Sequence, residues 1–160
     1  MIFDLASLDG GVAQGDVHDP TARLLGGIAG NAGLFSTVAD LERFAQAMLG
    51  GGQLGTARIL VPESVREMVT VTAGQPHGLG WMIDQMVNQS SFMGRLGEEW
   101  AWGRTGYTAT SLVVSPKRGL VVILLTNRVH PLSKGPSTLI QPVRRAVADA
   151  ALRLFGPQRD

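Results

Sequence analysis

The stretch W-G-R-T-G-Y at residues 102–107, followed directly by the alternating run 108–114, is the most informative part of this sequence. A cation, a hydroxyl and a glycine that open a β-rich run are suited to line one wall of a binding site. Arg104 could bind a substrate carboxylate, and Thr105 could donate a hydrogen bond to it. Gly106 would let a substrate lie close to the strand, because a side chain there would block the approach. The alternative is an ordinary strand that begins with a surface arginine.

Composition indicates one folded domain. The 160 residues are 44% hydrophobic and 17% charged, which is ordinary for a globular protein and excludes a disordered one. The net charge is +1 and the basic residues are scattered, so neither nucleic acid nor an anionic membrane is indicated as a partner. The absence of cysteine excludes disulfides, thiolate metal sites and a thiol nucleophile. We expect a single domain over residues 1–160, with no metal and no cofactor.

Hydrophobic runs in the sequence are short. The longest, Leu120 to Leu125, is far shorter than the roughly 20 residues that a membrane-spanning helix needs. Residues 1–10 have no basic segment of the kind that begins a signal peptide. The sequence therefore predicts no transmembrane segment, and it leaves the localisation open.

The first half of the chain is predicted to be a glycine-rich loop followed by helices. Residues 1–35 show no sustained period, and we expect an ordered, extended loop. Thr37 can cap a helix, and Asp40 occupies the capping-box position. An apolar stripe at helical spacing follows, and glycines 50–52 end it. The stripe consists of Leu41, Phe44, Ala45, Met48 and Leu49. A shorter helix is predicted to begin at Pro62.

The second half is predicted to form a sheet and a final helix. Strands are expected over 78–84, 107–114 and 120–126, with a tight turn over 115–119. The run 120–125 is apolar without alternation, which favours a central strand covered on both faces. A helix is predicted over about 137–155. Pro142 lies inside that pattern, so the helix either starts near it or kinks there.

Two other groups of residues could belong to a site. Asp16, His18 and Asp19 could form a metal site or a charge-relay pair. We favour a loop in which Asp19 caps backbone N–H groups and His18 packs, because the sequence has no second cluster of ligands. The three tryptophans could line a cleft, but packing in the core or at its rim is the more ordinary role. They are Trp81, Trp100 and Trp102.

Five blocks of sequence, taken in order, resemble the C-terminal part of class C β-lactamase-like serine hydrolases. The branch is the one that holds penicillin-binding-protein-like carboxypeptidases and esterases. The blocks are G-D-V-H-D-P-T-A (15–22), G-G-I-A-G-N-A-G-L-F-S-T-V-A-D-L (26–41), H-G-L-G-W (77–81), W-G-R-T-G-Y-T-A-T-S (102–111) and L-L-T-N-R-V-H-P (124–131). The resemblance implies a mixed α+β fold, a partial β-lactamase/transpeptidase-like domain whose antiparallel sheet is flanked by helices. Members of this family are often extracytoplasmic.

The resemblance also assigns roles to the stretch that we quoted first. Arg104, Thr105 and Gly106 correspond to the family's third motif, K-T-G or H-T-G, which binds substrate. The backbone N–H of Tyr107 would supply half of the oxyanion hole, and the nucleophile's own N–H the other half. Two positions depart from the family pattern. Arg104 does not shuttle protons near neutral pH, so electrostatic and carboxylate-binding roles remain for it. Asn31 stands where many relatives have histidine.

The nucleophile and the general base of the family are not found in this sequence. No serine has a lysine three residues later, so the S-x-x-K motif is absent. Tyr107 is the only tyrosine and lies in the third motif, so the family's Y-x-N motif is absent too. We therefore expect no catalytic residue in this chain, and no activity from it alone.

Three hypotheses follow. The chain is the C-terminal part of a serine hydrolase that acts on a peptide, ester or β-lactam carbonyl, with a small-molecule or peptide acyl substrate. Alternatively, it is a stand-alone module, derived from that fold, that binds a carboxylate ligand or a protein. In the third hypothesis it is an enzyme with another nucleophile, such as Ser111 or Thr105. Under the first hypothesis, sheet edges normally covered in the family would be exposed, which predicts dimerisation or aggregation.

Overall fold

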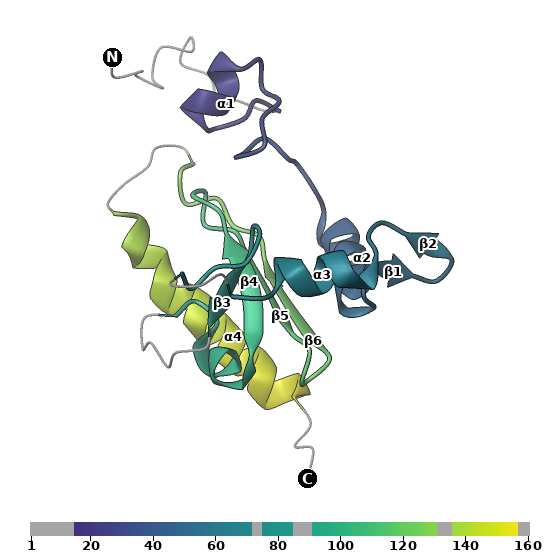
Figure 1. Cartoon of the computed structure of the whole chain (residues 1–160). Coiled ribbons are helices and arrows are strands. Elements are labelled where there is room, and N and C mark those ends of the chain that lie inside the picture. Colours follow the sequence, from purple (N-terminus) through teal and green to yellow (C-terminus); the bar gives the residue numbers. More distant parts are fainter. Residues whose placement is uncertain (1–14, 72–74, 85–90, 131–135, 157–160) are drawn as a thin grey trace.

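A four-stranded antiparallel sheet lies at the centre of the protein (Figure 1). The computed structural model describes residues 15–71, 75–84, 91–130 and 136–156. The strands pair in the order β3-β4-β5-β6. They are β3 (Met82–Asp84), β4 (Ala101–Thr105), β5 (Ser111–Ser115) and β6 (Leu120–Leu124). This mixed arrangement of helices and antiparallel strands confirms the predicted α+β class.

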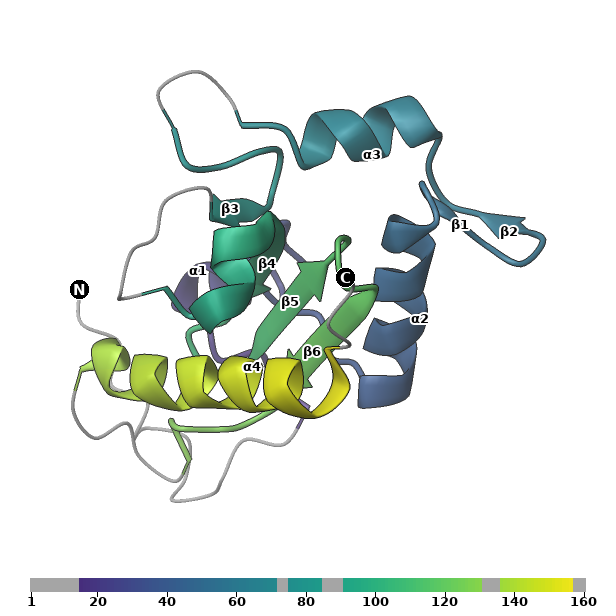
Figure 2. The same ribbon diagram turned by 90° about the horizontal axis from the view of Figure 1, so that it is seen from below.

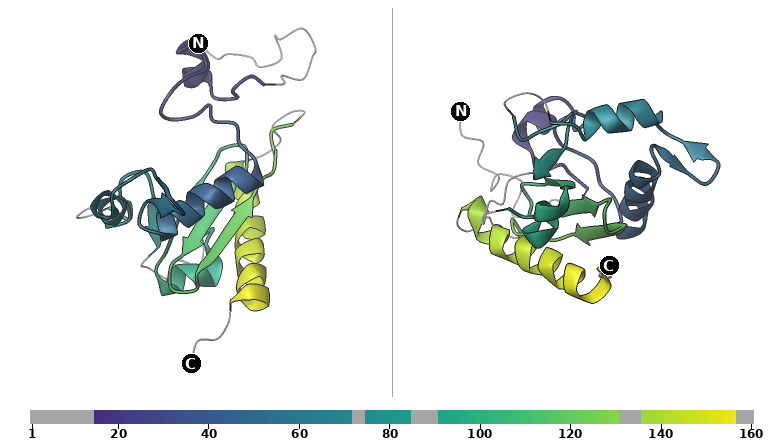
Figure 3. Two further views of the ribbon diagram at one scale, coloured as in Figure 1. Left: turned by 90° about the vertical axis from the view of Figure 1, so that its right-hand side faces the viewer. Right: turned by 60° about the horizontal axis from the view of Figure 1, so that its bottom comes forward.

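Helices cover both faces of the sheet. The long helix α4 (Gln141–Phe155) and the 3-10 helix η2 (Gly94–Glu99) pack on one face. The helices α2 (Val38–Leu49) and α3 (Pro62–Met68) lie on the other. The left view of Figure 3 shows the sheet edge-on between these layers, and Figure 2 shows α4 and α2 on opposite sides of β6. The strand β5 is buried at every residue because both layers cover it.

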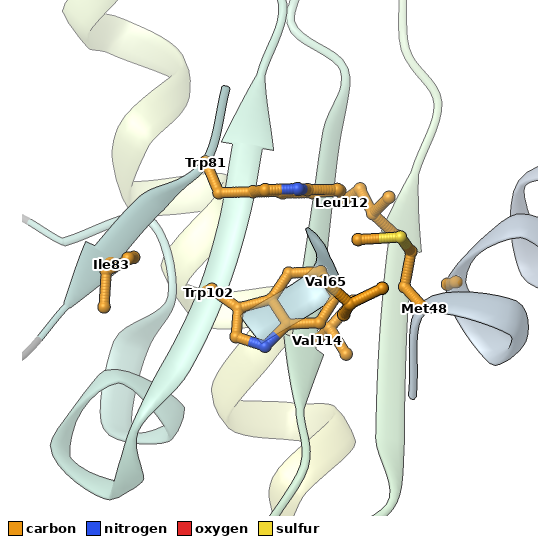
Figure 4. Close-up of a cluster of buried hydrophobic side chains, with 8 residues drawn as sticks. Met48, Val65, Trp81, Ile83, Trp102, Leu112 and Val114 are labelled. Atoms are coloured by element: carbon orange, nitrogen blue, oxygen red, sulfur yellow. The ribbon is translucent and has the colours of Figure 1, made fainter. Parts of the chain in front are cut away.

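The core has two parts, one on each face of the sheet. On the α2 and α3 face, Trp81 and Trp102 meet edge to face with ring centroids 4.6 Å apart, and helix side chains pack around them (Figure 4). The other residues buried there are Ala45, Met48, Val65, Ile83, Leu112 and Val114. On the α4 face the buried residues are Phe92, Met93, Leu96, Ala101, Val113, Val122 and Ala148. Two of the three tryptophans are thus core residues, and Trp100 is 50% exposed.

The predicted helix starts are confirmed. Thr37 caps α2, and its hydroxyl accepts a hydrogen bond from the backbone N–H of Asp40 at 3.2 Å. Pro62 lies in the first turn of α3, and Pro142 lies in the first turn of α4. Of the two alternatives for Pro142, the helix starts near it, directly after the 3-10 turn η3 (Ser137–Ile140). A small hairpin joins α2 to α3; its strands are β1 (Gln53–Leu54) and β2 (Ala57–Arg58).

Three sequence-based predictions about the sheet need correction. The strand expected over 78–84 is limited to Met82–Asp84, and Trp81 precedes it. The stretch 102–107 does not open a strand: Thr105 ends β4, and residues 106–110 form a turn before β5. The predicted strand 107–114 is therefore wrong for its first half, because the glycine and the positive φ of Ala109 reverse the chain there. The run 120–125 is covered on both faces as predicted, but among the described strands it lies at the edge of the sheet. Within the described residues β6 pairs on one side alone, and its apolar character reflects contact with both α2 and α4.

The tight turn over 115–119 is confirmed. The N–H of Arg118 donates to the carbonyl of Ser115 at 3.2 Å, which places Pro116 at the second position of the turn. Gly119 follows with a φ of 58°, a left-handed conformation that favours glycine. This turn sets the register that pairs Ser115 with Leu120.

The N-terminal part of the described chain lies apart from the sheet (Figure 1). It contains the short helix α1 (Pro20–Leu24), which Asp19 caps, so the extended loop expected over residues 1–35 is wrong there. Residues 1–14 of that loop lie outside the described residues. Several apolar side chains around it are exposed, Leu34 completely and Ile28 to 90%. No helix within the described ranges combines the length and apolar character that crossing a membrane requires.

Candidate functional site

Arg104 and Thr105 lie at the end of β4. Arg104 is paired with Leu112 and is exposed to solvent, and Thr105 is half-buried opposite Ser111. Because side chains alternate along a strand, Arg104 lies on the same face as Trp102, two residues earlier. Arg104 is thus accessible at the edge of the tryptophan core, whereas Thr105, the next residue, lies on the opposite face of the strand. Ser111, which we considered as a nucleophile, is buried at the start of β5.

Gly106 starts the turn that links β4 to β5. Its N–H donates to the carbonyl of Thr110 at 2.9 Å, and its carbonyl accepts from the N–H of Ala109 at 3.0 Å. A β-carbon at position 106 would collide with the hydroxyl of Thr110. The turn itself therefore favours glycine here, independently of any bound substrate. Ala109 is fully buried with a φ of 90°, a conformation that costs free energy for a residue with a side chain.

Tyr107 projects from this turn between two other segments. The residue is 61% exposed, and its ring stacks on the imidazole of His18, with ring centroids 5.5 Å apart and planes 23° from parallel. The guanidinium of Arg128 lies 4.4 Å from the centroid of the same ring, a cation–π contact. Three of the five sequence blocks, which are far apart in the chain, thus meet at Tyr107.

Arg128 also holds the backbone of the turn. Its Nε donates to the carbonyl of Tyr107 at 2.9 Å, and its own N–H donates to the carbonyl of Thr108 at 3.1 Å. The hydroxyl of Thr126 donates to the carbonyl of Ala109 at 3.1 Å. The segment that follows β6 therefore fixes the turn from outside the sheet.

Arg144 fixes the turn from the α4 side. It is 5% exposed, and its Nη2 donates to the carbonyls of Gly106 at 2.7 Å and Thr110 at 2.9 Å. Burial, and secondarily the neighbouring Arg128 cation, lowers the pKa of Arg144 below its ordinary value. A guanidinium nevertheless stays ionised in a protein. The sequence analysis missed this residue, although a signal existed: a cation lies four positions before Ala148, on the buried side of α4.

The ordinary interpretation of Asp19 is confirmed, and His18 has an additional contact. The Asp19 carboxylate accepts from the N–H of Ala22 at 2.8 Å and from the amide of Asn31 at 3.0 Å. The hydrogen bond from Ala22, followed by that from Asn31, lowers the pKa of Asp19. Asn31 thus stabilises the loop of α1. The packing of His18 against the third-motif tyrosine was not foreseen, because nothing in the local pattern links residues so far apart.

The N–H of Tyr107 makes no backbone hydrogen bond within the described residues. No acceptor in the described parts of the chain takes a hydrogen bond from it. A free N–H after an exposed cation and a hydroxyl suits the binding of an anionic oxygen. A pocket of about 220 Å³ lies elsewhere, between α2 and α3, and residues 104–107 do not line it. Among the residues that the structure describes, no three histidine, aspartate or glutamate side chains gather as metal ligands would.

The sequence model of the Beta-lactamase family matches residues 5–142. This chain belongs to the β-lactamase family. Proteins named "Putative D-alanyl-D-alanine carboxypeptidase" from Escherichia coli O157:H7 and from Escherichia coli strain K12 are each 33% identical to it over 118 residues. A protein of the same name from Salmonella paratyphi B is 32% identical over 121 residues. In each case the match covers 72% of this chain and 27% of the relative, so the chain spans about a quarter of these relatives.

A solved β-lactamase-family structure has the same fold. The crystal structure of a β-lactamase from Mycobacterium bovis aligns with a TM-score of 0.60 and 22% sequence identity. The alignment covers 79% of this chain and 47% of that one. The resemblance that the five sequence blocks indicated is therefore confirmed at the level of family and fold. The roles of Arg104, Thr105, Gly106 and Tyr107 in substrate binding stay predictions.

Proposed function

We propose that this chain is the C-terminal part of a β-lactamase-family acyl-serine hydrolase, in which it provides one wall of the active site. Arg104 and Thr105 bind a substrate carboxylate, and Gly106 gives the substrate room to approach. The N–H of Tyr107 donates to the developing oxyanion. The observation that carries the proposal is the N–H of Tyr107, which has no acceptor among the described residues and follows the exposed Arg104 by three positions in the chain.

The nucleophile belongs to the part of the enzyme that this chain does not contain. An acyl-serine mechanism needs an activated serine and a base, and the sequence holds neither S-x-x-K nor Y-x-N. Chain length agrees with this assignment, because the match covers 27% of the carboxypeptidase-like relatives and 47% of the solved β-lactamase. The isolated chain is accordingly expected to be inactive, since removal of nucleophile and base together leaves little of the chemistry.

The substrate that we propose is a peptide ending in a free carboxylate, within the broader class of peptide, ester and β-lactam carbonyls. Two features support it: Arg104 is a permanent cation with a planar fork that matches a carboxylate, and the curated relatives carry carboxypeptidase names. Esterase and lactamase activities differ from it through cleft loops rather than through the fold.

The exposed edge of the sheet is the proposed site of a protein partner. β6 has the sequence L-V-V-I-L, with no charge or proline to discourage pairing with another strand. Within the described residues its outer edge is unpaired. We expect the preceding part of the longer enzyme to cover this edge, and a second copy of the chain to pair there when that part is missing.

The experiment that tests the function begins with the DNA upstream of the Met1 codon. An open frame encoding S-x-x-K and, further on, Y-x-N would define the longer protein, which is then expressed and treated with a fluorescent penicillin. We expect one serine to be acylated. A stop codon and a ribosome-binding site directly before Met1 would instead contradict the hydrolase proposal and favour a stand-alone binding module.

The role of Arg104 is tested on that longer protein with a pair of substrates. A peptide with a free C-terminal carboxylate is compared with the same peptide ending in an amide. Arg104→Gln is expected to reduce kcat/KM for the carboxylate by about 10- to 100-fold and to leave the amide nearly unchanged. Arg95→Gln, a change at another exposed arginine, is the matched control. Equal loss on both substrates would contradict carboxylate binding by Arg104.

A further inference from the structure

Arg144 is a buried cation whose partners all lie in or next to the functional turn. Its Nη2 donates to two carbonyls of the turn, those of Gly106 and Thr110. Its Nη1 donates to the side chain of Gln141 at 3.3 Å. No carboxylate among the described residues pairs with it, and its buried Nε has no partner there. Burying a charge without an ion-pair partner is costly, and the two hydrogen bonds to the turn carbonyls offset part of that cost.

The carbonyl that Arg144 binds belongs to the same peptide unit as the N–H of Tyr107. A peptide unit is planar and almost always trans, so its C=O and its N–H point in opposite directions. A hydrogen bond that fixes the direction of the Gly106 carbonyl therefore also fixes the direction of the Tyr107 N–H. Arg144 thus acts on the proposed oxyanion donor through a rigid unit, without touching the substrate.

The orientation of this peptide unit is only weakly fixed by its local geometry. Gly106 lacks a β-carbon, so rotation of the unit meets less steric resistance than at other residues. The turn is also strained at Ala109, whose φ is 90°. Without a strong partner for the Gly106 carbonyl, the unit could turn its N–H away from the substrate side. The N–H of Ala109 is the other donor to this carbonyl, and it comes from within the same strained turn.

The positive charge of Arg144 has a second effect. A cation on a carbonyl polarises the whole peptide unit, which makes its N–H a stronger donor. The environment is buried, so this interaction is screened less than it would be in water. A side chain without hydrogen-bond donors, such as methionine, would supply neither the polarisation nor the fixed direction.

We propose that Arg144 is a positioning residue that orients and polarises the 106–107 peptide unit, so that the Tyr107 N–H is preformed as an oxyanion donor. The orientation is a property of this chain alone. The catalytic consequence rests on the proposed function.

The orientation can be measured at a single signal, because Tyr107 is the only tyrosine. The 160-residue chain is labelled with ¹⁵N-tyrosine and carbonyl-¹³C-glycine, so that a correlation spectrum selects the Gly106–Tyr107 peptide unit. In Arg144→Met we expect both the Gly106 carbonyl and the Tyr107 amide resonances to move by more than a line width. Arg145→Met is the matched control, since Arg145 lies on the same helix but donates to the carbonyl of Ser91 at 3.3 Å. It is expected to leave both resonances in place.

Two further measurements distinguish unfolding of the Arg144→Met variant from a change in the orientation of its 106–107 peptide unit. The indole N–H signals of Trp81 and Trp102 report on the core, and we expect Arg144→Met to leave them unchanged. Arg144→Lys keeps the charge but not the fork, so its Tyr107 signal should lie between those of wild type and Arg144→Met. If the tryptophan signals are native and the Tyr107 amide of Arg144→Met overlays that of wild type, the proposal is wrong.

The catalytic consequence is tested in the longer hydrolase. Arg144→Met is expected to lower kcat for the carboxylate-terminated peptide by about 10- to 100-fold with little change in KM. Arg104→Gln should act mainly on the carboxylate preference, so the two variants have different signatures. If the wild-type protein is not acylated at all, the proposed function fails while the resonances still decide whether Arg144 orients the peptide unit.

Discussion

The strands over residues 101–124 and the N-terminal segment over residues 15–37 both contain large apolar side chains, yet they differ in burial. Trp102 is 2% exposed and Val114 is fully buried, whereas Leu34 is fully exposed. The sheet residues are covered by α2, α3 and α4, whereas among the apolar side chains of the segment only Val17 and Ala22 are buried. An apolar side chain can be buried without a large cost, but it is buried only where other helices or strands pack around it. We expect mutations in the two regions to have correspondingly different effects.

Truncation of the central tryptophan tests the buried region most strongly. Trp102→Ala removes a side chain packed between Trp81, Val65 and Met48, and it should lower the free energy of unfolding by about 3–5 kcal/mol. Trp100→Ala is the control, because Trp100 is half exposed. Its expected loss is below about 1 kcal/mol. Denaturation followed by far-UV circular dichroism measures both, and equal losses would contradict the assignment of Trp102 to the core.

A methyl group added inside the sheet should have the next largest effect. A β-carbon at position 103 would overlap the backbone carbonyl of Leu112 and approach the ring of Phe92 to 3.1 Å. Gly103→Ala is therefore expected to lower stability by about 1–3 kcal/mol. The corresponding change in the N-terminal segment is Gly30→Ala, where nothing lies within 4 Å of the new atom. That variant should match wild type in the same denaturation experiment.

The ion pair between Glu99 and Arg118 gives the sheet region a pH-dependent contribution. Arg118 makes two hydrogen bonds to the carboxylate, and these hold the pKa of Glu99 below its ordinary value of 4.5. Because the pKa is lower in the folded state, the stabilisation is present above pH 4.5 and is lost as the pH falls through the folded pKa. Glu99→Gln should be less stable than wild type at pH 7, by less than Gly103→Ala, and the difference should vanish at acidic pH.

Glu63→Gln is the control for this ion pair. Glu63 pairs with Arg66, but both side chains are about two-thirds or more exposed, at 71% and 67%. An exposed pair contributes little, so at pH 7 this variant should differ from wild type by less than Glu99→Gln does. A difference between Glu99→Gln and wild type that persists unchanged at acidic pH would rule out the ion pair as its cause.

The N-terminal segment should respond in association rather than in stability. Leu34→Ser and Ile28→Ser replace side chains that are 100% and 90% exposed. Each should change the free energy of unfolding by no more than about 0.5 kcal/mol. Self-association of the isolated chain, measured by sedimentation velocity, should decrease because an exposed apolar surface is removed. Unchanged association would point to the β6 edge as the contact between copies.

The sequence was sufficient for local features and insufficient for those that depend on distant contacts. Thr37, Pro62 and the turn before Gly119 act on their own neighbours, and their predicted effects are confirmed. The end of β4 at Thr105 was not predicted, because a strand and a turn both tolerate the residues 106–110. The edge position of β6 was missed because helices on both sides give it the composition of a central strand.

The candidate site divides in the same way. Arg104 and Thr105 could be identified from their order in the chain, and the structure places them on an accessible strand end. The contacts that His18, Arg128 and Arg144 make with the turn could not be predicted from the sequence, because each contact joins segments that are far apart in the chain. The residues that hold this turn in place contact it directly but are far from it in the sequence, so a short motif does not include them.

The sequential order of the strands has a consequence for how the chain acquires its structure. Each strand of the β3-β4-β5-β6 sheet pairs with its neighbour in sequence, and the β4–β5 and β5–β6 connections span only residues 106–110 and 116–119. Pairings between nearby residues form quickly, because little chain entropy is lost in closing short loops. We therefore expect this meander to be an early folding nucleus, onto which α4 docks as soon as it has been synthesised.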